Sequence, residues 1–376
     1  MSPLPFRPEI SRLSTLVVKV GSRILLSEEN VPARKRIRGL VDSIARLQQA
    51  GVRTLLVSSG AIAHGMRALS LKKRPKSIPM KQACASIGQI RLMHLYETLF
   101  SRHGIPIGQV LLTWDDLRDK KRYLNLRNTF FHLLGCGAVP IINENDSVGV
   151  EEIRFGENDT LAAQIAMLVQ AEVFVNLTDI NGLYDKNPRL WKDARQIPLV
   201  DRFTPSLYKS AMGSAGEISV GGMITKLRAA ETVTKAGICA IIGDGFQATL
   251  LDVLTMPSAG TVFLPSKKIM PARHRWIAFT GKSEGVLLVD DGARKAIVEK
   301  GKSLLPAGVI KISGSFHPGA MVDVCDERKS PVARGMVNYS SEDILKIAGC
   351  KTSEIQQRLG QKTFDEVIHR DNLVVL

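Results

Sequence analysis

Two lysines and one aspartate are the residues of this chain that could most directly do chemistry. Lys19 precedes Gly21 at the end of an apolar run, Lys226 follows the pair Gly221-Gly222, and Asp159 lies between them in an acidic segment. In phosphoryl transfer, cations and backbone N–H groups take up the charge on phosphate oxygens, and a carboxylate can hold the cations in place. The three residues and their glycines therefore indicate phosphoryl transfer.

The sequence around Lys19 supports this interpretation. Residues 15–20 form a β-branched run that predicts a buried strand, and Gly21 predicts a turn directly after it. A lysine inside an apolar strand is costly unless it is paired, so we expect a buried partner; the alternative is an exposed lysine on an edge strand. A glycine at position 21 would let the backbone approach a phosphate closely.

The segment that ends at Lys226 predicts an anion site of another kind. Residues 221–226 precede a helical pattern through Leu227, Ala230 and Val233. Backbone N–H groups at a helix N-terminus bind anions, although a glycine pair before a helix is also a common turn. No Walker A motif, protein-kinase catalytic loop or GxGxxG fingerprint indicates another nucleotide-binding fold.

Two polar segments are suited to a small zwitterion. Residues 58–61, Ser-Ser-Gly-Ala, offer hydroxyl and backbone N–H donors, and residues 143–146, Asn-Glu-Asn-Asp, offer amides and carboxylates. A zwitterion with an additional carboxylate needs one anionic partner and several neutral donors. A Ser-Ser-Gly turn is also ordinary at the end of a strand.

Taken in order, residues 17–22, 58–63, 143–146, 156–159 and 221–226 resemble the amino acid kinase family, and within it the branch that phosphorylates glutamate. The resemblance implies ATP-dependent phosphorylation of the γ-carboxylate of L-glutamate, which gives L-glutamyl 5-phosphate and ADP and begins proline biosynthesis. It also implies that ATP is the cosubstrate and that Mg²⁺ binds through the ATP phosphates with few direct ligands from the protein, so no residue is assigned as a metal ligand.

The resemblance also implies roles for individual residues. The catalytic residues would be Lys19, Lys226 and Asp159, with Asp159 hydrogen-bonded to both lysines. Glutamate would be bound by Ser59, Gly60, Ala61, Asn143, Asp146 and Asn158. ATP would be bound by Lys19, Gly21, Thr178, Asp179, Val220, Gly221, Gly222, Met223, Ile224, Thr225 and Lys226.

Within these sets, residues 59–61 would hold the γ-carboxylate and Asp146 would pair with the α-ammonium group, assisted by Asn143. Thr178 and Asp179 would contact the ribose and base of ATP.

The chain departs from the family pattern near both ends of the site. Val220 stands where threonine is usual, Ser219 stands where glycine is usual, and Glu157 stands where the family often has aspartate. Residues 157–159 are also typical of a helix N-terminus, and a capping aspartate can bind a lysine at the same time.

The pattern of elements predicts an α/β fold for residues 1–265. Apolar strand-like runs at 15–20, 54–57, 105–112, 138–142, 173–177 and 238–242 alternate with helical patterns such as 36–50. Such runs are typical of parallel strands covered on both faces, and ligands bind at the C-terminal ends of these strands. We expect a three-layer α/β/α sandwich of the amino acid kinase type.

The residue composition and the pattern of predicted elements change after Pro265. Residues 266–273 are polar and bounded by prolines, which predicts a linker. Strand-like runs follow at 285–290, 308–312, 319–324 and 332–337, with a helical segment at 291–297. Residues 274–376 resemble a PUA domain, so a small, mostly β domain is expected there.

Composition excludes few classes. The chain has 376 residues, of which 44% are hydrophobic and 23% charged, which is typical of globular enzymes and favours two domains. Five cysteines form no CxxC pair, so we expect reduced thiols in a cytoplasmic protein. The proline-broken N-terminus predicts no signal peptide, and no apolar run approaches the roughly 20 residues of a membrane span.

The net charge of +15 invites a nucleic-acid interpretation. Residues 271–376 contain 16 Lys and Arg against 13 Asp and Glu, so most of the excess lies in residues 1–270, much of it in the runs 34–38, 72–76 and 120–122. We interpret these runs as solvated surface that also attracts anionic substrates.

Two alternatives to a glutamate kinase remain open at this point. One is a kinase of the same fold for another small acid, such as acetylglutamate, aspartate, carbamate or a phosphate monoester. The other is an RNA-binding PUA protein with a vestigial kinase domain. Beyond glutamate and ATP, we expect a homo-oligomer (dimer or tetramer) and no membrane association; transfer of the product to a glutamyl-phosphate reductase and RNA binding are further hypotheses.

Overall fold

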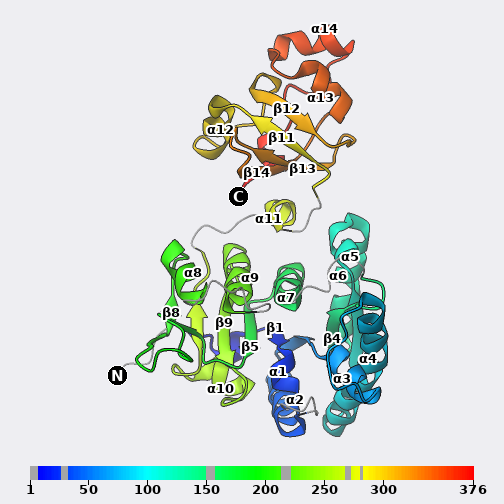
Figure 1. The fold of residues 1–376 in the computed structure, drawn as a ribbon, viewed down its shortest axis with the longest axis vertical. Coiled ribbons are helices and arrows are strands. Elements are labelled where there is room, and N and C mark those ends of the chain that lie inside the picture. The colour runs from blue at the N-terminus through cyan, green and yellow to red at the C-terminus, as the bar shows by residue number, and fades with distance from the viewer. Residues whose placement is uncertain (1–6, 27–32, 150–156, 213–221, 267–271, 280–282) are drawn as a thin grey trace. The chain divides into compact units, whose positions relative to one another are not determined.

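The computed structural model describes residues 7–26, 33–149, 157–212, 222–266, 272–279 and 283–376. The chain divides into two compact units, Met1–Ile269 and Met270–Leu376 (Figure 1). Most of the expected linker, 266–273, lies outside the described residues, and its last two residues begin helix α11 (Ala272–Phe279). The domain boundaries expected from the sequence remain a prediction.

The first unit is built on an eight-stranded sheet in the order β3-β4-β2-β1-β5-β9-β10-β8. Its strands are β1 (Thr15–Val20), β2 (Arg53–Val57), β3 (Ile107–Leu112), β4 (Val139–Glu144), β5 (Val173–Thr178), β8 (Leu199–Val200), β9 (Cys239–Asp244) and β10 (Thr261–Phe263). β10 pairs antiparallel with β9, whereas the other pairs in this sheet are parallel. The short antiparallel β10 was not predicted, because three residues carry too little periodicity.

Helices cover both faces of this sheet, which confirms the expected α/β/α layering (Figure 1). The helices are α1 (Ser22–Leu25), α2 (Arg34–Gln49), α3 (Ala61–Ala68), α4 (Ile78–Phe100), α5 (Trp114–Arg118), α6 (Lys120–Gly135), α7 (Glu157–Leu168), α8 (Pro205–Met212), α9 (Met223–Lys235) and α10 (Leu250–Thr255). A hairpin of β6 (Leu183–Tyr184) and β7 (Gln196–Ile197) follows β5. Helix α2 contacts α4 and α10, and α7 contacts α9.

The alternation of side chains along β1 determines which face receives Lys19. Leu16, Val18 and Val20 belong to one apolar cluster with residues of α2, α4 and α10, such as Ile44. Successive side chains of a strand point to opposite faces, so Lys19 points to the other face, where α7 packs against β1. The sheet therefore delivers this lysine to α7.

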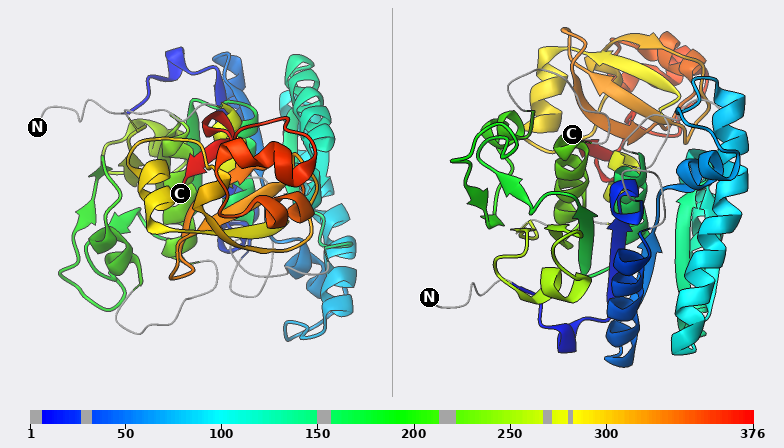
Figure 2. Two further views of the ribbon diagram at one scale, coloured as in Figure 1. Left: turned by 90° about the horizontal axis from the view of Figure 1, so that it is seen from above. Right: turned by 60° about the horizontal axis from the view of Figure 1, so that its bottom comes forward.

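Helices α3 and α4 are in backbone contact. A Cβ atom on Gly65 would lie 1.8 Å from the carbonyl oxygen of Cys84, and one on Gly88 would lie 1.8 Å from the carbonyl oxygen of Ala61. No real side chain tolerates such distances, so both positions require glycine. Figure 2 shows α4, in light blue, along one side of the first unit.

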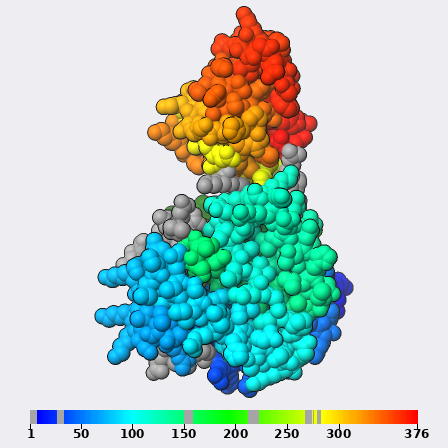
Figure 3. All heavy atoms as spheres, turned by 90° about the vertical axis from the view of Figure 1, so that its right-hand side faces the viewer, coloured from blue at the N-terminus to red at the C-terminus, as the bar shows by residue number. Residues whose placement is uncertain are grey.

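The basic runs lie on the surface, as expected, with one exception. Lys72, Lys73 and Lys76 are exposed, and so is the run 120–122. Arg36 is only partly exposed, because its guanidinium donates to the carbonyl oxygens of Ile24 and Leu26. Figure 3 shows one face of the first unit, where the light-blue segment around α4 adjoins the cyan to turquoise segment from β3 to β4.

The second unit is a small, mostly β fold, as expected. Its five-stranded sheet has the order β12-β11-β13-β14-β15. The strands are β11 (Gly285–Val289), β12 (Val309–Ser313), β13 (Met321–Cys325), β14 (Pro331–Met336) and β15 (Leu373–Val375). The helices are α11, α12 (Asp291–Val298), α13 (Ser341–Ile347) and α14 (Ile355–Leu359). Among the described residues of both units, no helix is long and apolar enough to cross a membrane.

Candidate active site

Lys19 and Asp159 form a buried ion pair. Lys19 Nζ lies 2.6 Å from Asp159 Oδ1, and the two residues are 5% and 1% exposed. Lys19 comes from β1 in the middle of the sheet and Asp159 from the first turn of α7. The structure therefore excludes the alternative of an exposed lysine on an edge strand.

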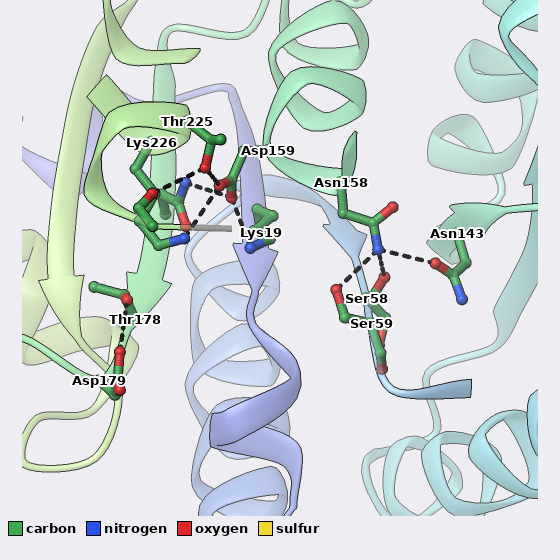
Figure 4. A network of polar contacts seen from close by, with 12 residues as sticks. Lys19, Ser58, Ser59, Asn143, Asn158, Asp159, Thr178, Asp179, Thr225 and Lys226 are labelled. Carbon is green, nitrogen blue, oxygen red and sulfur yellow. Dashed lines mark hydrogen bonds and ion pairs between the residues drawn. The ribbon is translucent and has the colours of Figure 1, made fainter. Parts of the chain in front are cut away.

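The second oxygen of Asp159 binds the start of α9. Lys226 Nζ lies 3.1 Å from Asp159 Oδ2, and Thr225 Oγ1 donates to the same oxygen at 2.6 Å (Figure 4). Lys226 is 7% exposed. One carboxylate thus holds both lysines that the sequence singled out, and the three residues come from segments far apart in the chain.

Asn176 completes this lysine–aspartate cluster and was missed in the sequence. Its Nδ2 donates to Asp159 Oδ1 at 2.9 Å, and it is paired with Lys19 in the register of β5 against β1. A single amide inside the apolar run 173–178 was the available signal, because a buried polar side chain needs a partner.

The charges of the cluster act on one another. Burial raises the pKa of Asp159, but the charges of Lys19 and Lys226 and its hydrogen bonds outweigh this effect and hold that pKa well below its usual range. Burial lowers the pKa of Lys226, and the charge of Lys19 lowers it further, while Asp159 opposes both. The site thus contains two buried lysines and one carboxylate, which favours an anionic ligand.

A second group of polar side chains lies beside this cluster. Asn158 Nδ2 donates to the Ser58 carbonyl oxygen at 3.0 Å, to Ser59 Oγ at 2.8 Å and to Asn143 Oδ1 at 3.1 Å (Figure 4). Asn143 Nδ2 in turn donates to Oε1 of Gln89, at 3.1 Å. We call Gln89, Asn143 and Asn158 the amide chain.

The turn before α3 has the geometry that its sequence predicts. Gly60 has φ of 96°, a left-handed conformation that favours glycine, and it forms the N-cap of α3. Ser59 precedes it and Ala61 begins the helix, so the three predicted residues lie together where β2 meets α3. Ser58 Oγ is hydrogen-bonded to Tyr96 of α4 at 2.9 Å, which anchors the turn from behind.

Asp146 lies in the turn after β4. Arg74, from the basic loop between α3 and α4, is close enough for its charge to act on Asp146. Burial raises the pKa of Asp146 to about 6, and the nearby charge of Arg74 opposes the shift. The sequence placed Arg74 in a solvated run; the structure also brings it into the field of this carboxylate.

Three residues predicted to bind the nucleotide, Gly21, Thr178 and Asp179, lie at or just after the ends of β1 and β5. A Cβ atom on Gly21 would meet only ordinary contacts, 3.7 Å from the Leu177 carbonyl oxygen and 3.9 Å from Lys19 Nζ, so the protein's own packing does not account for the glycine. Thr178 ends β5 and donates to Asp179 Oδ1 at 3.2 Å.

Two arginines, Arg23 and Arg189, bind Asp179. Arg23 Nη1 and Arg189 Nη2 lie 2.8 Å and 2.7 Å from Asp179 Oδ2. Burial raises the pKa of Asp179, but these hydrogen bonds lower it to about 2. The sequence contained no signal for Arg23, whose position follows only from the short helix α1 after Gly21.

The glycine segment before α9 is described only in part. Gly222 forms the N-cap of α9, and Met223, Ile224 and Thr225 form its first turn. Val220 and Gly221, also predicted to bind ATP, lie outside the described residues, as does the departure at Ser219. The start of α9 thus presents its N-terminus next to the lysine–aspartate cluster, through Thr225 and Lys226.

Comparison with known proteins defines the class. The model of the amino acid kinase family matches residues 14–244 and that of the PUA domain matches residues 285–359. The chain belongs to the amino acid kinase family, which confirms the resemblance seen in the sequence. A structure of carbamate kinase from Giardia lamblia bound to AMP-PNP covers 68% of this chain and 99% of its own, with a TM-score of 0.50 and 15% identity. At that identity, the likeness shows the fold alone.

Relatives that match nearly the whole chain carry a more particular name. Glutamate 5-kinase of Thermoanaerobacter sp. (strain X514) is 49% identical over 363 residues, which cover 96% of this chain and 97% of the relative. Glutamate 5-kinase of Syntrophus aciditrophicus (strain SB) is 46% identical over 368 residues, which cover 98% and 95%. Glutamate 5-kinase of Geobacter sulfurreducens is 44% identical over 368 residues.

Proposed function

We propose that this protein transfers the γ-phosphoryl group of ATP to the γ-carboxylate of L-glutamate, giving L-glutamyl 5-phosphate and ADP, the first step of proline biosynthesis. The observation that carries the proposal is the buried cluster in which Asp159 holds Lys19 and Lys226. The full-length relatives named glutamate 5-kinase support the choice of substrate.

The cluster acts by electrostatic stabilisation. The glutamate carboxylate attacks the γ-phosphorus in line, and negative charge spreads over the phosphoryl oxygens and the leaving oxygen of ADP. Lys19 and Lys226 take up this charge, and Asp159 keeps both ammonium groups charged and aimed. The acceptor is already a carboxylate, so the reaction needs no general base and no covalent intermediate with the protein.

Glutamate binds beside the cluster. Ser59 and the backbone N–H groups of Gly60 and Ala61 hold the γ-carboxylate, while Asp146 pairs with the α-ammonium group, assisted by Asn143. The contacts of Asn158 to Ser59 and Asn143 support this assignment, because Asn158 links the two binding segments and adjoins Asp159 in the chain.

ATP binds along the C-terminal ends of β1 and β5 and the start of α9. Gly21, Gly222 and the first turn of α9 offer backbone N–H groups to the phosphates, and Thr178 and Asp179 contact the nucleoside. Both oxygens of Asp159 already accept hydrogen bonds from lysine, threonine or asparagine side chains. Because the Asp159 carboxylate is already engaged by these side chains, the site fits a Mg²⁺ ion that is held through the ATP phosphates, where it would neutralise phosphate charge.

ADP release measured with a panel of small acids tests the proposal. We expect rapid ADP release with ATP, Mg²⁺ and L-glutamate, and background rates with aspartate, N-acetylglutamate and carbamate. A preference for another acid would replace glutamate as the substrate but keep the fold. No release with any acid, from a protein that binds RNA tightly at physiological salt, would favour the vestigial-kinase alternative.

The other partners are proposals of a coarser kind. An acyl phosphate hydrolyses readily, which supports direct use of the product by a reductase. The second unit carries little net charge, which argues for weak, salt-sensitive RNA binding. Homo-oligomerisation and a cytoplasmic location complete the proposal; the cysteines among the described residues are all free thiols, in agreement with a reducing compartment.

A further inference from the structure

A buried glutamine in the middle of α4 takes no part in the assignments above. Gln89 is 7% exposed, and its Oε1 accepts a hydrogen bond from Asn143. Its Nε2 is buried and has no hydrogen-bond partner within the described part of the chain. Buried polar groups of native proteins are nearly always paired, so an unpaired donor beside a binding site points to a ligand.

The packing of α3 on α4 brings Gln89 to the substrate site. Its neighbour Gly88 is so close to the first turn of α3 that a Cβ atom there would lie 1.8 Å from the carbonyl oxygen of Ala61 and 2.4 Å from the nitrogen of Gly65. Gln89 therefore lies next to the turn proposed to hold the reacting carboxylate.

The amide chain orients Gln89. Asn158 uses its Nδ2 on Ser59 and on Asn143, and Asn143 uses its own Nδ2 on Gln89 Oε1. Because the Nδ2 of Asn158 donates to Asn143 Oδ1, the Nδ2 of Asn143 is turned toward Gln89 and donates to its Oε1. The Nε2 of Gln89 is therefore the free donor at the end of the amide chain. The other end, Asn158 Oδ1, is a buried acceptor that also lacks a partner among the described residues.

The free donor matches a group of glutamate that has no partner so far. The proposed function assigns donors to the γ-carboxylate and an acceptor to the ammonium group, but it assigns nothing to the α-carboxylate. A desolvated carboxylate needs hydrogen-bond donors. Building on the proposed function, we propose that Gln89 is a substrate-binding residue whose Nε2 donates a hydrogen bond to the α-carboxylate of glutamate.

The variant Gln89→Glu isolates this hydrogen bond. It keeps an oxygen to accept from Asn143 Nδ2, and it replaces the donor with a carboxylate that repels the α-carboxylate. We expect kcat/KM for glutamate to fall by about 10- to 100-fold, through KM, which is the loss typical of one hydrogen bond to a charged group. The KM for ATP should change less than about twofold.

Glutamate α-amide provides the readout that a structural role would not move. Its carboxamide can donate to the carboxylate that Gln89→Glu introduces, so the variant should process the α-amide at least as well as the wild type does. The ratio of kcat/KM values for glutamate and its α-amide should therefore fall sharply in Gln89→Glu. As a control, Gln49→Glu makes the same change of charge at the exposed end of α2 and should leave the ratio unchanged.

Each outcome decides between the two proposals. A wild type that does not turn over glutamate would refute the proposed function itself. A wild type that does, with an unchanged ratio in Gln89→Glu, would overturn the assignment of Gln89. An unchanged ratio with equal losses for both substrates would mean that Gln89 only supports Asn143. If Gln89→Glu does not fold, Gln89→Met removes the donor without adding charge and should still lower the ratio.

Discussion

Asp159 Oδ1 lies 2.6 Å from Lys19 Nζ, and this ion pair is almost completely shielded from solvent. A buried charge is strongly destabilising when its partner is removed, because the remaining charge has no counter-ion and little water. The ion pair therefore stabilises the folded site and also positions Lys19 for its chemistry.

We expect Asp159→Asn to abolish phosphorylation and to lower the free energy of unfolding by about 3–5 kcal/mol, because two buried lysines lose their counter-ion. Denaturant unfolding at neutral pH would measure this change; since the folded-state pKa of Asp159 is depressed, its stabilising charge is fully present there. Asp291→Asn, in an exposed cluster with Arg294 and Lys295, should barely alter the unfolding curve. Equal effects of the two substitutions would contradict the role of burial.

We expect Lys226→Ala to reduce turnover by roughly 10²-fold or more while glutamate binds nearly as well as before, because the lysine acts on charge that develops during transfer. Turnover by ADP release and glutamate affinity by calorimetry would separate these effects. Lys235→Ala, at the other end of α9 and in a partly exposed ion pair with Glu231, is the matched control. Near-normal turnover of Lys226→Ala would refute the mechanism.

We expect kcat/KM for glutamate to fall as the pH decreases through about 6, because Asp146, whose pKa is raised to about 6, must be ionised to pair with the α-ammonium group. The affinity is therefore present above this pH and lost below it. Asp146→Asn should raise the KM for glutamate at every pH and remove this dependence, with a smaller effect on ATP. A pH profile of Asp146→Asn that matches the wild type would exclude the assignment.

We expect Gly88→Ala to destabilise the first unit by about 1–3 kcal/mol or more and to raise the KM for glutamate, because the new methyl group would have to separate α4 from Ala61. Gly39→Ala in α2 is the matched control: apart from its chain neighbours and the backbone of its own helix, no heavy atom of the described residues lies within 4 Å of its Cβ position, so the substitution should stabilise the protein by about 0.5–1 kcal/mol. Thermal unfolding and glutamate kinetics on both variants would test this. A neutral Gly88→Ala would mean that the helices can move apart freely.

We expect a chain that ends at Ser266 to remain folded and to keep its kinase activity, because the residues assigned to catalysis and binding all belong to the first compact unit. Turnover and RNA binding of the shortened and full-length chains would test this. Loss of turnover in a well-folded shortened chain would show that the second unit completes the active site.

The sequence predicted the strands that carry clear local signals. The apolar run 15–20 coincides with β1. The resemblance to the amino acid kinase family implied that Asp159 binds both Lys19 and Lys226, and the three side chains are in contact. Asn176 was missed although it carries a local signal, since a buried amide in an apolar strand needs a hydrogen-bond partner.

Gln89 carries no such signal. A glutamine in a helix is ordinary, and neither the 3.6-residue period nor its neighbours distinguish it. Its environment results from the contact of α3 with α4, which depends on Gly65 and Gly88. The positions of these two glycines in the sequence do not predict that the helices touch there. Gln89 could therefore not be predicted from the sequence, because its environment arises from tertiary packing.

The contact between α3 and α4 would determine the length of the substrate that the site accepts. The first turn of α3 follows the glycine that would hold the reacting carboxylate, and α4 carries the donor proposed for the carboxylate at the other end of the substrate. With backbone touching backbone at Gly65 and Gly88, these helices cannot approach further to suit a shorter molecule. The distance between the two carboxylate-binding groups would therefore be fixed. Aspartate, one methylene shorter, would be rejected because it cannot reach both groups, and not because it clashes with a side chain.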